Sequence, residues 1–312
     1  MPDSQMPQRP KTRRNTERTE RRAAVRASNQ DQKPKQEKGF SALATRIGSG
    51  AIYVMLTCVA VLINDVTNVI MLSFVAAMCA FEYYRMLRND AKMPNELIGI
   101  VAAALIPVAC WKFGLHGIIS VLMLFILALA IWYVFYLRAR IVDISVSFFG
   151  AVYTGLLLCG LIYIRAALPE PYGGLLLLLL FVSIWGNDAV AYLVGSRIGK
   201  HKLAPKVSPK KSWEGFIAGL LFSALTWFAM TFIPGVSMAW WQALLFGVIA
   251  GLVSVLGDLL ESRIKRNVGV KDSGNIMPGH GGLFDRCDSL FMVSMLSALM
   301  LFGGGCIPYA GL

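Results

Sequence analysis

Long runs of apolar residues constrain this chain more than any other feature of its sequence. They begin at residue 48 and continue almost to the C-terminus. Several approach the ~20 residues that an α-helix needs to cross ~30 Å of hydrocarbon. Hydrophobic residues make up 56% of the 312 residues and charged residues only 15%, whereas soluble domains carry about 25% charged residues. We therefore predict an all-α, polytopic integral membrane protein.

The apolar runs predict about nine transmembrane helices. Their approximate bounds are 48–64, 66–82, 97–112, 117–137, 144–165, 173–196, 214–233, 239–260 and 289–308. Only Asn64 and Asp65 separate the first two segments, so we expect these to form a tight helical hairpin. We divide the membrane part into N-terminal helices in residues 46–170 and a C-terminal catalytic region in residues 171–312.

Residues 1–45 differ in composition from the rest of the chain. They contain eleven Lys and Arg, five Asp and Glu, and very few large apolar side chains. Such a segment cannot bury enough apolar surface to fold alone. We predict a basic, disordered cytoplasmic tail that contacts anionic lipid headgroups. About half of the net charge of +12 lies in this tail, and we expect no nucleic-acid partner.

The distribution of basic residues predicts the orientation in the membrane. With nine spans and a cytoplasmic N-terminus, 28 of the 30 Lys and Arg residues fall on the cytoplasmic side. Only Lys112 and Arg165 fall on the other side. Cytoplasmic loops of membrane proteins carry such an excess of Lys and Arg. The pattern therefore favours a cytoplasmic N-terminus and an external C-terminus.

Polar and ionisable residues enter the apolar segments mainly between residues 183 and 293. An ionised side chain at the centre of a span costs about 2.5–3.5 kcal/mol on insertion scales, so it usually faces a polar cavity or has a function. Asp188 is the first example, and Tyr192 shares its helical face. An interhelical hydrogen-bonding cluster is the alternative interpretation.

A second polar group, residues 208–215, precedes one of the predicted spans. We interpret Ser208 to Lys211 as a loop and Ser212 as the N-cap of the next helix. Lys210 and Lys211 would then lie near a helix N-terminus, where backbone donors and the helix dipole favour a polyphosphate. Lysines that only fix the topology are the alternative.

A third group lies where the span 239–260 ends. Asp258, Glu261, Ser262 and Lys265 share one helical face at spacings of three and four residues. A carboxylate, a hydroxyl and an amine on one face suit a metal–phosphate site. The alternative is an exposed salt-bridge face, which stabilises a helix by only ~0.3–0.5 kcal/mol.

The fourth group runs from Lys271 to Ser289 and is the richest. Its glycines allow the backbone to approach a phosphate closely, and His280 lies among them. Asp285 and Asp288 are three residues apart at the start of the last span, so both carboxylates can face one cation. Mg²⁺ prefers a few carboxylates together with substrate phosphates.

These groups resemble the motifs of one enzyme family. The pattern Ser262-x-Ile264-Lys265-Arg266-x4-Lys271-Asp272-x-Gly274-x3-Pro278-x-His280-Gly281-Gly282-Leu283-x-Asp285-Arg286-x-Asp288 closely resembles the signature of phosphatidate cytidylyltransferases, or CDP-diacylglycerol synthases. Residues 208–215 and 187–192 are similar to two further blocks of that family. The resemblance covers roughly residues 183–293. Met277 and Cys287 depart from the branched aliphatic or Phe residues expected there.

The resemblance implies that the protein converts CTP and phosphatidate into CDP-diacylglycerol and pyrophosphate with a divalent metal. It also implies a bacterial inner membrane, with the active site facing the cytoplasm. We assign Asp258, Asp285 and Asp288 to Mg²⁺, and a second cation is left open. Asp188 would complete the metal site or orient a ligand. The substrate-binding residues would be Ser208, Lys210, Lys211, Ser262, Lys265 and Asp188.

Three further residues would act near the reacting phosphates. Lys271 would hold a phosphate, and Arg286 would contact the leaving pyrophosphate. His280 would either order the loop or act in catalysis. A transporter that uses Asp188 and Asp258 is the main alternative, and a lipid kinase or another CTP-dependent lipid-phosphate transferase is a second one. Membrane lipids are expected partners, and a homodimer is left open.

Overall fold

The computed structural model describes residues 39–88, 90, 92–204, 208–279 and 281–309. Most of the predicted basic tail, residues 1–45, lies outside the described residues. By its internal contacts the chain divides into residues 1–42 and residues 43–312, and the account below concerns the second unit. The described residues are mostly helical, as the apolar segments predict.

The first two apolar segments form helices α2 (Gly39–Ile63) and α3 (Asp65–Arg88), and only Asn64 separates them. The Asn64 side chain accepts a hydrogen bond from the Thr67 backbone N–H at 2.9 Å. The Thr67 hydroxyl donates to the Ala60 carbonyl at 2.8 Å. These bonds satisfy backbone groups that the helix ends leave without partners. The predicted tight connection is therefore present.

Helix α4 (Glu96–Phe135) contains two of the predicted segments, which the chain joins without a loop. The helix is interrupted at Gly114, whose φ of 57° and ψ of −139° are not helical. Only glycine adopts this conformation at low cost because it has no Cβ. At the start of the helix, the Asn95 side chain accepts from the Ile98 N–H at 3.1 Å and caps it.

The predicted segment 144–165 consists of three consecutive helical pieces. These are α5 (Ile141–Ala151), the π-helical turn η1 (Val152–Leu156) and α6 (Cys159–Ala166). The wider turn brings Gly155 against α4, where a Cβ at Gly155 would lie 2.8 Å from the Ala103 carbonyl oxygen. The π turn therefore lets this segment pack closely against its neighbour.

Arg165, in the last turn of α6, is buried and joins the ends of several helices. Its Nε donates to the Val61 carbonyl at 2.8 Å, and its guanidinium pairs with Asp65 and, at 2.8 Å, with Glu170. The cation thus has acceptors from the α2–α3 connection and from the segment that follows α6. A buried guanidinium needs such partners.

The C-terminal half is built from four long helices that pack through small residues. They are α7 (Tyr172–Ile198), α8 (Trp213–Met230), α9 (Trp240–Asn267) and α10 (Phe284–Gly303). Ser223 of α8 donates to the Gly247 carbonyl of α9 at 2.7 Å, and a Cβ at Gly247 would lie 2.5 Å from Ala224 Cα. Small residues of this kind let helix backbones approach closely within a membrane.

The connection between α7 and α8 contains a small antiparallel sheet of β1 (Lys202–Ala204) and β2 (Ser208–Ser212). The prediction that Ser208 to Lys211 form a loop is therefore wrong, and this hairpin is an addition to the otherwise helical fold of the described residues. Short lysine-rich strands have no apolar alternation that would reveal them. The predicted N-cap is confirmed, because Ser212 Oγ accepts from the Gly215 N–H at 3.2 Å.

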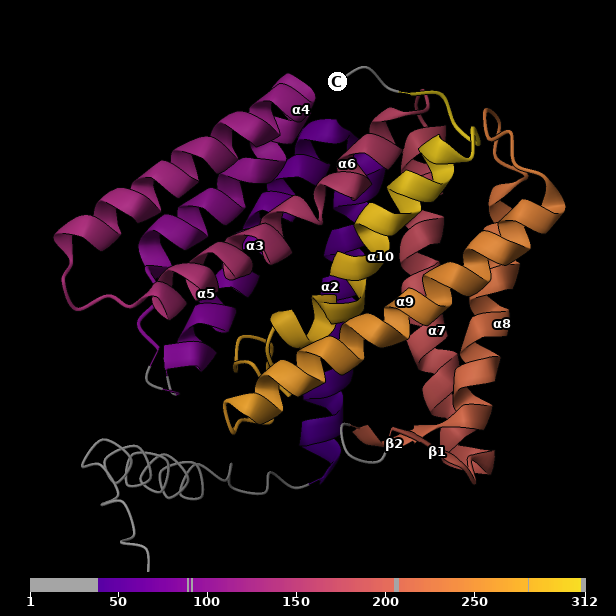
Figure 1. Cartoon of the computed structure of the whole chain (residues 1–312). Coiled ribbons are helices and arrows are strands. Elements are labelled where there is room, and N and C mark those ends of the chain that lie inside the picture. The colour runs from indigo at the N-terminus through magenta and orange to yellow at the C-terminus, as the bar shows by residue number, and fades with distance from the viewer. Residues whose placement is uncertain (1–38, 89, 91, 205–207, 280, 310–312) are drawn as a thin grey trace, which may run out of the picture. The chain divides into compact units, whose positions relative to one another are not determined.

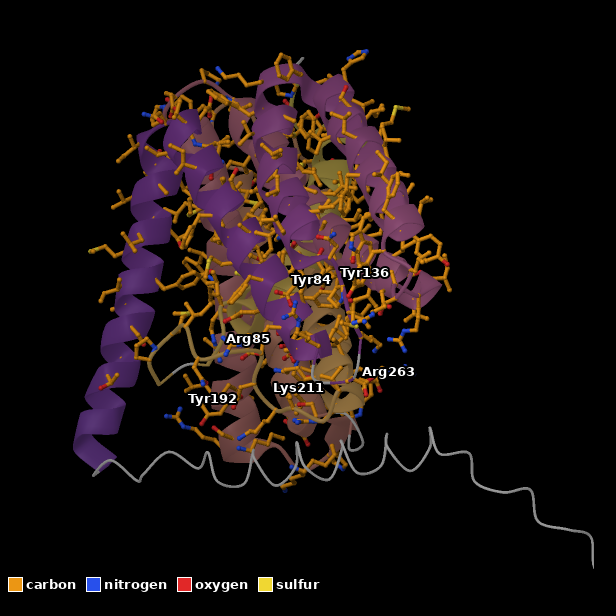
Figure 2. All side chains as sticks on the ribbon, turned by 90° about the vertical axis from the view of Figure 1, so that its left-hand side faces the viewer. Tyr84, Arg85, Tyr136, Tyr192, Lys211 and Arg263 are labelled. Atoms are coloured by element: carbon orange, nitrogen blue, oxygen red, sulfur yellow. The ribbon has the colours of Figure 1, made fainter. Side chains whose placement is uncertain are left out.

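The polar motifs gather at one end of the bundle (Figure 1). The β-hairpin, the C-terminal end of α9 and the start of α10 lie at that end, and α10 ends at the opposite end. Arg85, Lys211 and Arg263 lie in the same lower part of the molecule (Figure 2). Segments that are far apart in the sequence thus place their polar motifs at one end of the bundle.

Seven helices of the described chain are long and apolar enough to cross a membrane. They are α3, α4, the segment Ile141–Ala166, α7, α8, α9 and α10. Helix α2 adds a shorter apolar stretch, Ile47–Ile63. All nine predicted segments are helical, but α4 contains two of them and the apolar stretch of α2 is short. Large apolar side chains such as Leu124 and Leu225 are exposed, as lipid-facing residues are.

Candidate active site

A cavity of about 890 Å³ lies beside the β-hairpin. Its acidic lining residues are Asp188, Asp258, Asp285 and Asp288. Its basic lining residues are Lys202, Lys210, Lys211 and Arg286. Apolar and aromatic side chains also line it, namely Tyr53, Val54, Trp185, Tyr192, Leu203, Phe216, Val255 and Met277. One cavity therefore presents carboxylates, cations and apolar side chains.

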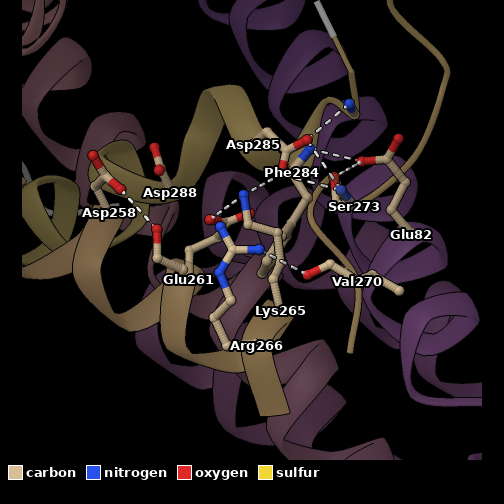
Figure 3. Close-up of polar contacts among 12 residues, drawn as sticks. Glu82, Asp258, Glu261, Lys265, Arg266, Val270, Ser273, Phe284, Asp285 and Asp288 are labelled. Carbon is tan, nitrogen blue, oxygen red and sulfur yellow. Dashed lines mark hydrogen bonds and ion pairs between the residues drawn. The ribbon is translucent and has the colours of Figure 1, made fainter. Parts of the chain in front are cut away.

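Three carboxylates from two helices meet at the inner side of this region (Figure 3). Asp258 and Glu261 of α9 and Asp288 of α10 each offer an oxygen within 4.8 Å of the others. Gly257 lets the helices approach, since a Cβ there would lie 2.6 Å from the Asp288 carbonyl oxygen. Glu261 is only 1% exposed, and its Oε1 has no hydrogen-bond partner among the described residues. Such a set of hard oxygen donors suits a divalent cation like Mg²⁺.

Lys265 links this cluster to the start of α10 (Figure 3). Its Nζ lies 2.7 Å from Glu261 Oε2 and 2.8 Å from Asp285 Oδ1. Asp285 Oδ2 also accepts from the backbone N–H groups of Ser273 and Gly282, both at 3.0 Å. The Asp285 carboxylate is thus bonded on several sides and fixes the loop.

The β-hairpin extends lysines toward the carboxylates. Lys211 Nζ lies 2.5 Å from Asp258 Oδ2, and Ser262 Oγ donates to Asp258 Oδ1 at 3.2 Å. Lys210 is exposed at the cavity, and Ser208 also lines it. The hairpin therefore holds ammonium groups at the rim of the cavity, next to the carboxylate cluster.

Helices α7 and α2 form the remaining wall. Asp188 lies one turn before Tyr192, and both line the cavity. The neighbouring Asn187 donates from Nδ2 to Ser254 Oγ of α9 at 3.3 Å, which ties the two helices together. The Trp185 ring meets the Tyr53 ring of α2 edge to face, with centroids 5.9 Å apart. This side of the cavity therefore combines the Asp188 carboxylate with aromatic side chains.

Residues 44–302 match the model of a family described as the Cytidylyltransferase family. The chain belongs to this cytidylyltransferase family. The family resemblance seen in its motifs is therefore confirmed.

Individual relatives of this cytidylyltransferase-family protein include two from staphylococci. It is 39% identical over 165 residues to the phosphatidate cytidylyltransferase of Staphylococcus haemolyticus (strain JCSC1435), which covers 53% of this chain and 62% of the relative. It is 47% identical over 122 residues to the protein of the same name from Staphylococcus aureus (strain COL), covering 39% of this chain and 47% of the relative. The chain thus spans less than two thirds of the length of these curated relatives.

Most residues predicted for the site of this cytidylyltransferase-family protein lie at the cavity. They are Asp188, Ser208, Lys210, Lys211, Asp258, Asp285, Arg286 and Asp288. Ser262 and Lys265 lie just behind it and reach it through their bonds to Asp258 and Asp285. Lys271 is exposed and is not among the lining residues. His280 lies outside the described residues.

The geometry differs from the predicted metal set in one position. Asp258 and Asp288 face each other as expected, but the third carboxylate beside them is Glu261. Asp285 turns instead toward Lys265 and the loop amides. Glu261 shares the α9 face of Asp258, so its position was visible in the sequence even though it was not assigned a role.

Proposed function

We propose that this protein transfers the cytidylyl group of CTP to phosphatidate, which yields CDP-diacylglycerol and pyrophosphate. One observation carries the proposal: lysines of the β-hairpin meet Asp258 and Asp288 of the carboxylate cluster at a single cavity that apolar side chains also line. Cations fit the phosphates of both substrates, carboxylates fit a divalent ion, and the apolar side chains fit a lipid. Family membership and the names of the staphylococcal relatives support the same reaction.

In this reaction an oxygen of the phosphatidate phosphate attacks the α-phosphorus of CTP. The bond between the α-phosphorus and the oxygen that bridges to the β-phosphate breaks, and pyrophosphate leaves with the electron pair. The attacking oxygen is already ionised near neutral pH, so no general base is needed. Catalysis then consists of holding two anions in line and stabilising their charge.

The residues divide this work by their positions. Lys210 and Lys211 on the hairpin neutralise the nucleotide phosphates at the rim of the cavity. Arg286, which also lines the cavity, contacts the departing pyrophosphate. Lys265 forms ion pairs with Glu261 and Asp285 and so fixes the positions of both carboxylates. A guanidinium and two ammonium groups around the phosphates supply the electrostatic stabilisation that such reactions require.

The donor set of Asp258, Glu261 and Asp288 fits a Mg²⁺ ion, because hard oxygen ligands converge there and Glu261 Oε1 has no other partner among the described residues. We assign these three residues to the metal, and Asp188 to its outer edge or to a second cation. When bound, the ion supplies charge stabilisation to the phosphoryl oxygens. Asp285 then orders the loop rather than binding the ion directly.

We further propose nine crossings of a bacterial inner membrane, a cytoplasmic N-terminus and an active site on the cytoplasmic side. The support is the distribution of the basic residues along the sequence, which nine crossings with a cytoplasmic N-terminus divide into 28 on the cytoplasmic side and two, Lys112 and Arg165, on the other. A reporter that is active only outside the inner membrane should be active when fused to the C-terminus and inactive when fused to the N-terminus. The same reporter response at both ends would contradict the odd number of crossings.

Pyrophosphate release by the detergent-purified protein tests the reaction. With CTP, Mg²⁺ and phosphatidate, we expect pyrophosphate and CDP-diacylglycerol in equal amounts. Diacylglycerol in place of phosphatidate is the matched control, and it should give no product. Formation of CDP and phosphatidate from diacylglycerol would indicate a lipid kinase instead. Absence of turnover across several metals and lipids would favour a transporter.

A further inference from the structure

The N-terminal helices carry one buried carboxylate that the proposed mechanism does not use. Glu82 of α3 is only 2% exposed, and it lies outside the region of the sequence motifs. Its Oε2 accepts from the Ser273 hydroxyl at 3.1 Å and from the Phe284 backbone N–H at 2.8 Å (Figure 3). These partners are 191 and 202 residues further along the chain. Glu82 therefore joins α3 to the loop and helix that carry the site.

The bond to Phe284 is significant because Phe284 is the first residue of α10. The N-terminal N–H groups of a helix have no partner within the helix. At α10 the N-cap residue is Leu283, whose side chain makes no capping hydrogen bond. Glu82 supplies the missing acceptor from another helix, and a negative group at this position is also favoured by the helix dipole.

The loop is shaped to receive this carboxylate. A Cβ at Gly274 would lie 2.3 Å from Glu82 Oε1, and a Cβ at Gly282 would lie 2.5 Å from Glu82 Oε2. Any side chain at either glycine would therefore push α3 and the loop apart. On its other face the loop donates the N–H groups of Ser273 and Gly282 to Asp285. The loop is thus held between Glu82 and Asp285.

We propose that Glu82 is a positioning residue, which caps α10 from α3 and so fixes Asp285 and Asp288 against the carboxylates of α9. The effect on the metal site follows from a series of contacts. Glu82 accepts hydrogen bonds from Ser273 and Phe284, and the Ser273 N–H donates to Asp285. Asp285 pairs with Lys265, which also pairs with Glu261. Groups that orient metal ligands in this way typically change metal affinity or activity by about 10- to 100-fold when mutated. The effect on catalysis rests on the proposed function, whereas the cap itself does not.

Three variants of the full-length protein test the proposal. Glu82→Ala removes both acceptor bonds, and Glu82→Gln keeps an oxygen that can accept both. Tyr84→Phe is the matched control: Tyr84 is buried on the same helix, and its hydroxyl donates to the Ser147 carbonyl at 2.6 Å, away from the loop. We expect Glu82→Ala to raise the Mg²⁺ concentration for half-maximal pyrophosphate release by about 10- to 100-fold. Glu82→Gln should stay within a few-fold of the wild type, and Tyr84→Phe should change only the unfolding temperature.

Amide hydrogen exchange in detergent, without substrates, gives a readout that does not depend on activity. Glu82→Ala should speed exchange at Ser273, Gly282 and Phe284, and Tyr84→Phe should not. If Glu82→Ala does not fold, Ser273→Ala removes one of the two donors and should give a smaller change in the same direction. Wild-type exchange and Mg²⁺ dependence in Glu82→Ala would overturn the proposal, and so would a Glu82→Gln variant as impaired as Glu82→Ala. Absence of turnover in the wild type would reject the proposed reaction, while the exchange rates would still test the cap.

Discussion

Asp288→Asn is expected to abolish most of the CTP-dependent pyrophosphate release while leaving the protein folded. Asp288 and Asp258 are the two carboxylates that both the sequence and the geometry assign to the cation. The amide keeps the shape of the side chain but loses the charge that a divalent ion needs. A bound metal contributes several kcal/mol to charge stabilisation in the transition state. A loss of ~4 kcal/mol corresponds to a rate about a thousandfold lower.

The measurement is the initial rate of pyrophosphate release at several Mg²⁺ concentrations, for Asp258→Asn and Asp288→Asn alike. Asp65→Asn is the matched control, because Asp65 lies near Arg165 at the connection between α2 and α3, away from the cavity. Its rate per folded protein should equal that of the wild type, because Arg165 keeps the Glu170 carboxylate and the Val61 carbonyl as acceptors. Wild-type rates in Asp288→Asn at low Mg²⁺ would rule out the proposed metal ligands while leaving the reaction itself intact.

Lys265→Met is expected to produce the largest loss of stability among single substitutions at the site. Lys265 is 8% exposed and pairs with Glu261 and Asp285, which are themselves largely buried. Methionine has a similar length, but it leaves two carboxylates without their counter-ion. Removing one partner of a buried ion pair typically lowers the free energy of unfolding by about 3–5 kcal/mol. Thermal unfolding in detergent measures the change.

Lys271→Met provides the stability control, because Lys271 lies six residues after Lys265 and is exposed, so that the substitution removes the same charge from the surface. Its unfolding temperature should match that of the wild type. Lys265→Arg should recover part of the lost stability, since a guanidinium still reaches carboxylates but presents a different geometry. An unfolding temperature for Lys265→Met as high as that of Lys271→Met would contradict the described ion pairs.

The helices could be predicted from the sequence because apolar length alone identifies them. The span predicted to end at residue 260 belongs to α9, which continues to Asn267 and so contains the helical face predicted for Asp258, Glu261, Ser262 and Lys265. Ionisable residues at the end of a span usually indicate where a helix leaves the membrane, but here Glu261 and Lys265 remain helical and buried because they pair with each other and with Asp285. Tertiary partners thus extend the helix beyond its apolar part.

The site was predictable as a group of motifs but not in the role of each carboxylate. Spacing on α9 shows that Asp258 and Glu261 share a face. It does not show that the Asp285 carboxylate accepts from two loop N–H groups and pairs with Lys265. Those donors depend on the path of the loop, which no periodicity encodes.

Glu82 shows a further limit of reasoning from motifs. An ionisable residue in an apolar segment is costly and usually has a partner or a function, and Glu82 is such a residue. Glu82 lies at the end of the second predicted span, outside every recognisable motif, so nothing in the sequence indicates its partners. Only the packing of α3 against the start of α10 brings it to Phe284.

The ion pairs of Arg165 have a consequence for how the chain enters the membrane. A guanidinium that arrives among lipid chains without acceptors is costly. Asp65 lies 100 residues before Arg165 in the sequence, and Val61 lies 104 residues before it. Both have therefore left the ribosome when Arg165 is synthesised. Glu170 follows only five residues later. We therefore expect the α2–α3 hairpin to insert first and to receive α6 as it emerges, so that this arginine is neutralised during biosynthesis.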